Sequence, residues 1–464
     1  MEKNRSKYLL KNTAIFALGS IGTKMIAFFL VPLYTNLLSN SEYGIIDLVT
    51  TISTVLAPVL ILNINEAIMR FSLDENANTT EIMSIGITLL GMSLFWGLLL
   101  IPIASTFSII SEYSVCLYFY TVSLSGTQVF LGYLRGTERL VQFSIGNIIH
   151  ALAIACFNVI ALLLLKKGVQ GYFTAYIAAN IVTIIYAFIA GRIWKPLRKF
   201  HLNLALAKEM AKFSIVLIPN TFMWWIMNSS DRIMVTAMVG IAANGIYAIS
   251  YKVPSLVQTV TGIFNQAWSY SAIRENNSED RDAYSNRIFS GVFAMSCTTG
   301  IGLLTIMKPF LRFYVEKTYY SAWRYTPFLI VGFVFLTLGT FLSSYYTVNK
   351  DSKGFLFSGL TGAVANVILN ALLIPILGVT GAALATCLSY ILVFVYRIFD
   401  TKKYIQIQFG QAQQWISCCV LILAALTMYL DNTLGQVIQF VELGVILLIN
   451  RNIWISLLHH NIHL

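Results

Sequence analysis

The sequence predicts an all-α polytopic membrane protein with about 14 transmembrane helices. Of its 464 residues, 57% are hydrophobic and only 11% are charged, and the mean hydropathy is +0.73. A soluble domain of any class is far more polar. The apolar residues also fall into fourteen runs that are each about long enough to cross a bilayer, which takes roughly 20 residues.

The fourteen predicted spans follow one another with connections of no more than about 20 residues. The first is longer than a signal-peptide core and lacks a small-residue cleavage site at its end, so we expect it to remain as a spanning helix. The spans lie near 11–34, 44–64, 82–104, 114–134, 143–165, 171–191, 213–238, 243–268, 288–307, 325–346, 355–376, 379–399, 412–430 and 434–456.

The net charge of +11 is distributed by side of the membrane rather than gathered on a soluble face, which argues against a nucleic-acid partner. With fourteen spans, 22 Lys and Arg residues fall on the side of the termini and six on the other. The positive-inside rule then predicts that both termini are cytoplasmic. The six exceptions are Lys166, Lys167, Lys308, Arg312, Lys317 and Arg324.

The sequence contains a repeat. Gly44 and Gly245 are 201 residues apart, and Gly168 and Gly378 are 210 residues apart, each within a matching local string. We therefore expect two parallel six-helix repeats with a site near the bilayer midplane. The expected domains are an N-terminal lobe over 1–191, a basic cytoplasmic linker over 192–212, a C-terminal lobe over 213–399 and additional helices over 400–464.

Several features exclude other classes. The six cysteines lie inside apolar segments without metal-ligand or CxxC spacing, so neither a disulfide framework nor a metal site is indicated, and we expect no cofactor. An integral glycosyltransferase or polymerase would need paired carboxylates or a histidine cluster near a loop. Only His150 and His201 precede the C-terminal tail, and they are isolated, so we expect no catalytic residues.

The first two spans carry two charged residues. Lys24 lies 13 residues after Lys11, about 20 Å along a helix, which is well inside a hydrocarbon core of about 30 Å. A cavity-facing role is favoured over a snorkelling lysine. Asp47 opens a polar stripe in the second span, and it is either a carboxylate at the interfacial start of the helix or a counter-ion for Lys24.

The seventh span has a polar and aromatic face on which Trp224, Asn228 and Asp231 recur at helical spacing. Arg232 follows at once, either in a cavity or as an anchor at the outer headgroups, paired with Asp231. The eighth span has two polar rows, and a helix that faced only lipid would not carry them. The first row holds Lys252, Ser255, Thr259, Gly262 and Gln266, and the second Tyr247, Tyr251, Gln258 and Asn265.

Together these residues suit a ligand with an anionic head and a hydroxyl-rich body. Lys24, Arg232 and Lys252 would hold phosphate, whereas amides, hydroxyls and aromatic faces would contact sugars. The predicted substrate-binding residues are Lys24, Arg232, Lys252, Asn228, Tyr251, Ser255, Gln266 and Trp224. Asp47 and Asp231 are possible counter-ion or coupling residues, and a buried Asp231–Lys252 ion pair is the alternative to substrate contact by Lys252.

The sequence also resembles a known family over nearly its whole length. The resemblance is carried by Lys11-Asn12-Thr13, Pro32 to Thr35, Glu42-Tyr43-Gly44, Asp231-Arg232, Gly245-Ile246-Tyr247, Lys252-Val253-Pro254, Asn366 to Asn370, Pro375, Gly378 and Gly381 to Thr386. It is similar to the polysaccharide transporter branch, the Wzx-type oligosaccharide or O-antigen flippases, of the multidrug/oligosaccharidyl-lipid/polysaccharide (MOP, MATE-like) superfamily.

The resemblance implies two six-helix lobes forming a V, alternating access, and transfer of an undecaprenyl-pyrophosphate-linked oligosaccharide repeat unit from the cytoplasmic to the outer leaflet. Related flippases line a central cavity with cations, and the matching positions are Lys24, Arg232 and Lys252. A polysaccharide polymerase and glycosyltransferases are possible partners, alongside membrane lipids. The alternative is a MATE-like multidrug/ion antiporter, which would favour acidic residues for its cationic cargo.

Overall fold

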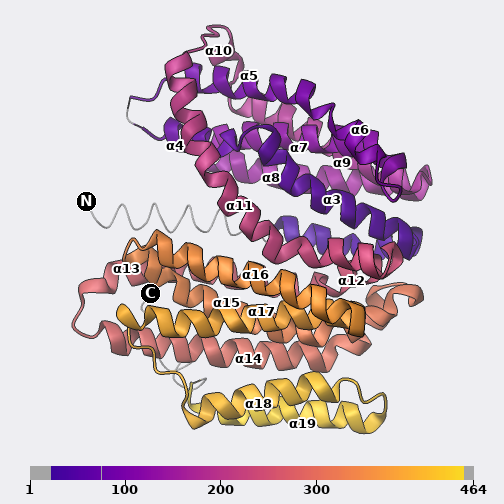
Figure 1. The fold of residues 1–464 in the computed structure, drawn as a ribbon, viewed down its shortest axis with the longest axis vertical. Helices are drawn as coiled ribbons and strands as arrows, with labels where there is room; N and C mark the ends of the chain where they lie inside the picture. Colours follow the sequence, from indigo (N-terminus) through magenta and orange to yellow (C-terminus); the bar gives the residue numbers. More distant parts are fainter. Residues whose placement is uncertain (1–21, 75, 454–464) are drawn as a thin grey trace. The chain divides into compact units, whose positions relative to one another are not determined.

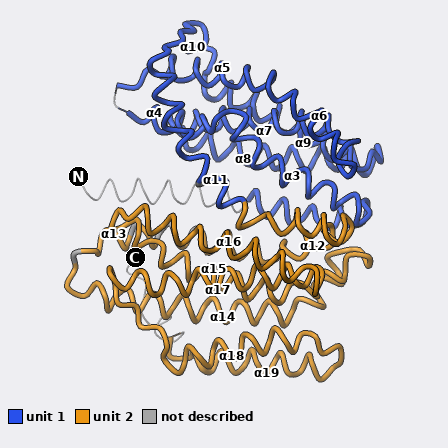
Figure 2. Tube along the Cα trace, in the orientation of Figure 1, with its two compact units in different colours: residues 1–225 blue, residues 226–464 orange. Residues whose placement is uncertain are grey.

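The computed structural model describes residues 22–74 and 76–453, and within these ranges the chain is helical and has no β-strand. The predicted all-α class is therefore confirmed. Figure 1 shows the helices as long, roughly aligned rods within each part of the chain. The chain divides into two compact units, Met1–Trp225 and Ile226–Leu464, and the division falls inside a single long helix, α11 (Leu204–Met238) (Figure 2).

Unit 1 begins, among the described residues, with a helical stretch over 22–29. Its further elements are α2 (Val31–Leu37), α3 (Asn40–Leu60), α4 (Ile64–Ser72), α5 (Thr79–Gly97), α6 (Leu100–Ser105), η1 (Ser111–Tyr113), α7 (Ser114–Gly136), α8 (Leu140–Asn158), η2 (Val159–Leu164), α9 (Gly168–Ala190), α10 (Trp194–Leu197) and the first part of α11.

Unit 2 continues α11 and ends the described chain. Its elements are α12 (Ile241–Ser250), α13 (Lys252–Arg274), η3 (Glu275–Asn277), α14 (Arg281–Tyr314), η4 (Lys317–Arg324), α15 (Thr326–Val348), α16 (Ser352–Leu377), α17 (Val379–Asp400), η5 (Thr401–Lys403), α18 (Ala412–Thr427) and α19 (Thr433–Ile449).

Helix ends follow local sequence signals. Ser39 and Glu42 form a capping box in which each side chain accepts from the other residue's backbone N–H, and this starts α3. Asp351 accepts from the backbone N–H of Gly354 and starts α16. The short α16–α17 connection is closed by Gly378, whose φ of +58° is one that other residues rarely adopt.

Ten helices in the described ranges are long and apolar enough to cross a membrane. They coincide with the predicted second to seventh and ninth to twelfth spans. The eighth span is divided between α12 and α13, and the thirteenth and fourteenth correspond to α18 and α19, which have 16 and 17 residues. Much of the first span lies outside the described residues, so the count of fourteen stays a prediction.

In unit 1, α5 and α7 pack against α4, a short helix that the apolar runs did not predict. Ile64 and Ile68 are fully buried against Ile82 and Val129 of the neighbouring helices. At Gly136 of α7, an added Cβ would lie 2.9 Å from the Cα of Met69, so α4 approaches α7 more closely than any larger residue permits.

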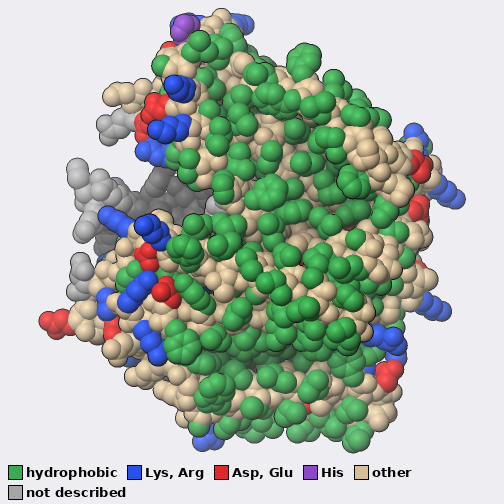
Figure 3. Space-filling model, viewed as in Figure 1, with side chains coloured by type: hydrophobic (Ala, Val, Ile, Leu, Met, Phe, Trp, Pro, Cys, Tyr) green, Lys and Arg blue, Asp and Glu red, His purple; other side chains and the backbone are tan. Residues whose placement is uncertain are grey.

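Much of the outer surface of each unit is apolar. Hydrophobic side chains cover the flanks of the helices, and charged side chains gather towards their ends (Figure 3). Large apolar side chains such as Phe95, Ile376 and Leu448 are mostly exposed. Such a surface is stable in contact with lipid chains and would be an aggregation hazard in water.

Candidate functional site

The candidate site is built where α11 turns back into α12 and the chain then breaks before α13. Gly240, with a φ of +129°, makes the turn between α11 and α12 possible. Tyr251 lies at the break, between the last residue of α12 and Lys252 at the start of α13. Tyr247 and Tyr251 are four residues apart and therefore on one helix face, and both hydroxyls meet Asp231 of α11.

The carboxylate of Asp231 is the centre of a buried hydrogen-bond network, and only 1% of this residue is exposed. Its Oδ2 accepts from the hydroxyls of Tyr251 at 2.5 Å, Tyr247 at 2.8 Å and Thr386 at 3.2 Å. Its Oδ1 accepts from the backbone N–H of Arg232 at 2.9 Å. Four donors therefore compensate for the burial of a carboxylate, which alone would be costly.

A second layer of amides surrounds this centre. Asn366 of α16 donates to the Thr386 hydroxyl at 3.4 Å, and its Oδ1 accepts from Ser230 and Asn370, both at 2.9 Å. The Oδ1 atom of Asn370 is buried and accepts no hydrogen bond. Carboxylate and amide oxygens together are the atoms that a proton or a hard cation would bind.

The network extends to α17 and to an aromatic wall. The hydroxyl of Tyr390 donates to Asn228 Oδ1 at 3.2 Å. The ring of Phe333 lies 6.2 Å from that of Tyr251 and 5.8 Å from that of Tyr390, with both pairs near perpendicular. Phe333 thus braces the two tyrosines from the side of α15.

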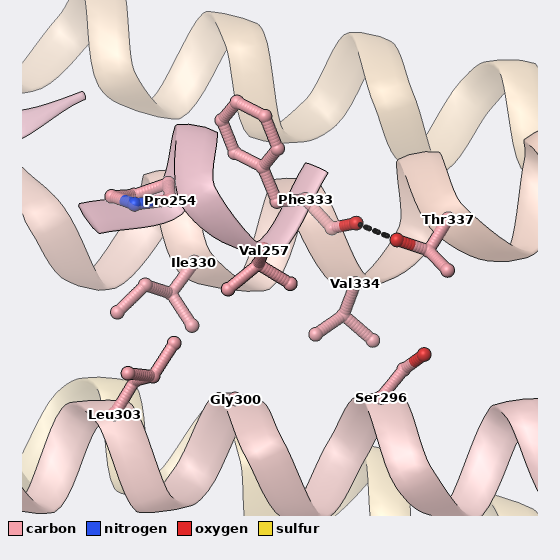
Figure 4. Close-up of a pocket in the computed structure, with 9 residues that line it drawn as sticks. All are labelled: Pro254, Val257, Ser296, Gly300, Leu303, Ile330, Phe333, Val334 and Thr337. Atoms are coloured by element: carbon pink, nitrogen blue, oxygen red, sulfur yellow. Dashed lines mark hydrogen bonds between the residues drawn. The ribbon is translucent and has the colours of Figure 1, made fainter. Parts of the chain in front are cut away.

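Behind Phe333 lies a small apolar pocket between α13, α14 and α15 (Figure 4). Pro254 and Val257 face it from α13, next to the Tyr251 break, and Gly300 lies on the opposite wall. The pocket presents no charged side chain, so it is not a site for an anionic cargo.

The predicted charges differ in their exposure. Asp231 and Asp47 are both buried, whereas Arg232 and Lys252 are half-buried and Lys24 is exposed. The guanidinium of Arg232 lies over the Tyr251 ring, 5.0 Å from its centroid, which is a cation–π contact. The accessible charges of the predicted site are therefore positive.

The other predicted residues are placed as follows. Asn228, Tyr251 and Asp231 belong to the Asp231 network. Ser255 is half-buried and donates to the Lys252 carbonyl at 2.8 Å. Trp224 is half-buried at the end of unit 1, and the side chain of Gln266 lies outside the part of the chain that the structure describes.

In unit 1, Asp47 is the eighth residue of α3, well past the helix start. The carboxylate that serves the start of α3 is that of Glu42, in the capping box. Nearby, the indole of Trp225 donates to the Thr51 carbonyl at 2.9 Å, which fixes α11 against α3 within this unit.

Two charged residues inside unit 2 escaped the sequence analysis. Arg397, only 2% exposed, donates to the Gly339 carbonyl at 2.8 Å and to the Ser358 hydroxyl at 3.1 Å. Glu442 of α19 is buried with one oxygen 3.0 Å from the Thr427 hydroxyl. Arg397 lies near the end of the predicted span over 379–399, and Glu442 could have been found as an acid in the middle of an apolar run.

No group of three or more His, Cys, Asp and Glu residues within the described ranges is arranged to hold a metal ion. In unit 2 the Asp231 network consists of hydrogen-bonded hydroxyls and amides around a carboxylate, with the guanidinium of Arg232 over the Tyr251 ring.

This fold has known relatives. The chain is similar to the lipid II flippase MurJ in an inward closed conformation, with a TM-score of 0.66 and 14% identity over 97% of this chain and 99% of that one. It is also similar to an inward-facing multidrug resistance MATE family transporter of the MOP superfamily, with a TM-score of 0.64 and 12% identity over 83% and 94% of the two chains. These likenesses define the class of fold, which is that of the MOP superfamily transporters.

Within that class the sequence is more specific. A family model described as "polysaccharide biosynthesis protein" matches residues 9–270. The match covers more than half of the chain, and the chain belongs to this family. Among curated proteins, an uncharacterized membrane protein of Methanocaldococcus jannaschii is 25% identical over 213 residues, which are 42% of this chain. The match spans about half the length of that relative, 47%.

Proposed function

We propose that this protein flips an undecaprenyl-pyrophosphate-linked oligosaccharide repeat unit from the cytoplasmic to the outer leaflet of a bacterial cytoplasmic membrane. The product would feed the synthesis of a surface polysaccharide such as O-antigen or capsule, in which a polymerase and glycosyltransferases are the expected partners. Membership of the polysaccharide biosynthesis family and the fold of a lipid II flippase support this proposal.

The observation that carries the proposal is the sign of the accessible charge. Arg232, Lys252 and Lys24 are half-buried or exposed, whereas Asp231 and Asp47 are buried. A pyrophosphate gains from contact with Lys and Arg in a medium of low dielectric constant. A cationic drug, the cargo expected of a MATE-like antiporter, would have to displace the tyrosine hydroxyls from Asp231 before it could reach a carboxylate.

We assign these cations to a cavity that works by alternating access, with Trp224, Asn228, Tyr251, Ser255 and Gln266 contacting the sugars. Asp231 would couple transport to a proton or cation. Neutralising its carboxylate would weaken the hydrogen bonds that it accepts from Tyr247 and Tyr251, next to the break before α13. Asp47 is assigned as a counter-ion within unit 1.

The test is replacement of Lys24 and Lys252 by Ala in a flippase-null strain, with the amount of protein in the membrane measured. We expect loss of surface polysaccharide, and partial recovery with Arg at the same positions, since Arg retains the charge. Unchanged surface polysaccharide in both Ala variants would overturn the assignment. Loss of drug resistance with normal polysaccharide would favour the antiporter.

The proposed orientation has its own test. Reporter fusions at Met1 and Leu464 should both report the cytoplasm. Reporters that placed the two ends on opposite sides would reject the even number of spans and, with it, the direction of transfer.

A further inference from the structure

A basic segment of unit 2 lies where basic residues are normally depleted. Four of the six Lys and Arg residues predicted on the side opposite the termini fall between Lys308 and Arg324. The positive-inside rule disfavours such a cluster, so its retention calls for anionic partners on that side.

Lys308 has such a partner within the protein. Its Nζ lies 3.1 Å from Asp431 Oδ1, in the turn between α18 and α19, and 4.1 Å from the centroid of the Trp323 ring. Lys308 is 9% exposed, and its charge is neutralised by the ion pair with Asp431. It fastens the α18–α19 turn to the end of α14.

The other three cations have no such partner. Arg312, Lys317 and Arg324 are all exposed, and no acidic side chain of the described residues forms an ion pair with them. The neighbouring acid, Glu316, accepts from the backbone N–H of Thr318 at 2.6 Å and from its hydroxyl, which begins η4. These bonds lower the pKa of Glu316 and occupy one of its oxygens.

Aromatic rings support the two arginines. The guanidinium of Arg312 lies 5.9 Å from the centroid of Tyr320, and that of Arg324 lies 5.9 Å from the centroid of Trp323. A guanidinium that rests on a ring face keeps its in-plane N–H groups available for an anion.

The same segment also presents an apolar group and is held rigidly. Phe313, next to Arg312, is 90% exposed. The hydroxyl of Tyr429 donates to the Arg324 carbonyl, so the α18–α19 turn holds the end of η4. Cations, amphipathic aromatic rings and an exposed phenyl ring at the end of membrane helices are the composition of a headgroup-level surface.

We propose that residues 308–324 bind the phosphate of an anionic phospholipid in the leaflet opposite the termini, through Arg312, Lys317 and Arg324. The ring of Tyr325, directly after η4, lies 6.2 Å from that of Tyr247, whose hydroxyl donates to Asp231. A bound lipid therefore holds η4 against α12, and through the contact of Tyr325 with Tyr247 it stabilises the position of a hydroxyl that donates to Asp231.

Two triple variants test the proposal in the purified full-length protein. One replaces the three cations by Gln (R312Q, K317Q and R324Q), and the other keeps the charge (R312K, K317R and R324K). Native mass spectrometry measures phosphatidylglycerol and phosphatidylcholine retained by each protein. We expect the wild type and the charge-keeping variant to prefer phosphatidylglycerol, and the Gln variant to lose on the order of tenfold or more of that preference, since each cation near an anionic surface contributes a several-fold factor.

An unchanged preference in the Gln variant, or no preference in the wild type, would overturn the proposal. A third arm adds undecaprenyl pyrophosphate as competitor. If it displaces phosphatidylglycerol from the wild type at equal concentrations, the site binds the transported lipid and the proposal is wrong. Because lipid binding is measured without transport, failure here leaves the proposed flippase function standing, and failure of the Lys24 and Lys252 test leaves this site standing.

Discussion

Helices α9 and α17 begin in the same way but bury different chemistry. Gly168 and Gly378 precede or open them with φ values of +51° and +58°, and the two sequences align at an offset of 210 residues. At that offset Tyr176 of unit 1 matches Thr386 of unit 2, and Asn180 matches Tyr390.

In unit 1 these positions belong to neutral packing. Tyr176 stacks on Tyr172 at 4.4 Å and meets Tyr120 edge-on at 5.8 Å. The amide of Asn180 donates to Ser123 at 3.0 Å and contacts His150 Nε2 at 2.9 Å. Such interhelical bonds hold a bundle together and are worth about 0.6 kcal/mol each on average in a membrane.

In unit 2 the matching positions face a carboxylate. Thr386 donates to Asp231, and Tyr390 donates to Asn228, three residues before Asp231 on α11. We infer that these positions of α9 serve packing in unit 1, whereas those of α17 hold Asp231, the carboxylate that we propose couples transport to a proton or cation. Four substitutions and one matched control test this difference.

The largest effect is expected for Asp231→Asn, which keeps the shape and removes the charge. If Asp231 couples transport to a proton or cation, the loss is that of a coupling free energy, about 1–3 kcal/mol or 5–150-fold in transport. Surface polysaccharide per unit of membrane-inserted protein is the measurement. Normal transport in this variant would make the unit 2 network as structural as that of unit 1.

A smaller effect is expected for Tyr251→Phe. The ring stays beneath Arg232, but the 2.5 Å bond to Asp231 is lost. Hydrogen bonds to charged groups contribute about 1.5–3 kcal/mol, so both thermal stability and transport should fall. The matched control is Tyr172→Phe on α9, where the stacked rings remain and no charge is involved, and only a slight change in either measurement is expected.

Asn180→Ala should affect stability alone. It removes the contacts to Ser123, Thr127 and His150, at a cost of about 1–2 kcal/mol for three interhelical bonds. We expect a lower melting temperature in detergent and unchanged transport per folded molecule. A change in the ion or pH dependence of transport would show that unit 1 also takes part in coupling.

The sequence was sufficient to predict the elements but not the partners. The polar face of Asp231 on one span, and that of Tyr247 and Tyr251 on the next, are each visible because helical spacing places residues of one helix on a shared face. Thr386 lies 155 residues after Asp231, and a single sequence gives no measure of which distant helix packs against which. For the same reason the cluster at Lys308 looked like an exception until Asp431, 123 residues later, was seen to pair with it.

The break at Tyr251 was missed for a different reason. The run over 243–268 is long enough for one span despite its polar rows, and Pro254 fits the first turn of a helix as readily as a break before it. The structure ends α12 at Ser250, four residues before Pro254, which has no N–H to donate to the Ser250 carbonyl.

The smallest effect is expected at Asp351, a half-buried carboxylate with donors much like those of Asp231. Its Oδ1 accepts from the Gly354 N–H at 2.9 Å and its Oδ2 from the Tyr404 hydroxyl at 2.8 Å. The Gly354 N–H first, and then the Tyr404 hydroxyl and Lys403, lower its pKa to about 2. Because the folded pKa lies below the unfolded value of about 3.9, the stabilisation is complete above that value and disappears as the pH falls through about 2.

Asp351→Asn keeps a capping side chain and removes the titration, so the wild type should melt slightly higher at neutral pH and the difference should vanish at the acid end. Transport should be unaffected. A transport defect in Asp351→Asn equal to that of Asp231→Asn would show that loss of any hydrogen-bonded carboxylate in unit 2 suffices, and that burial is not what sets Asp231 apart.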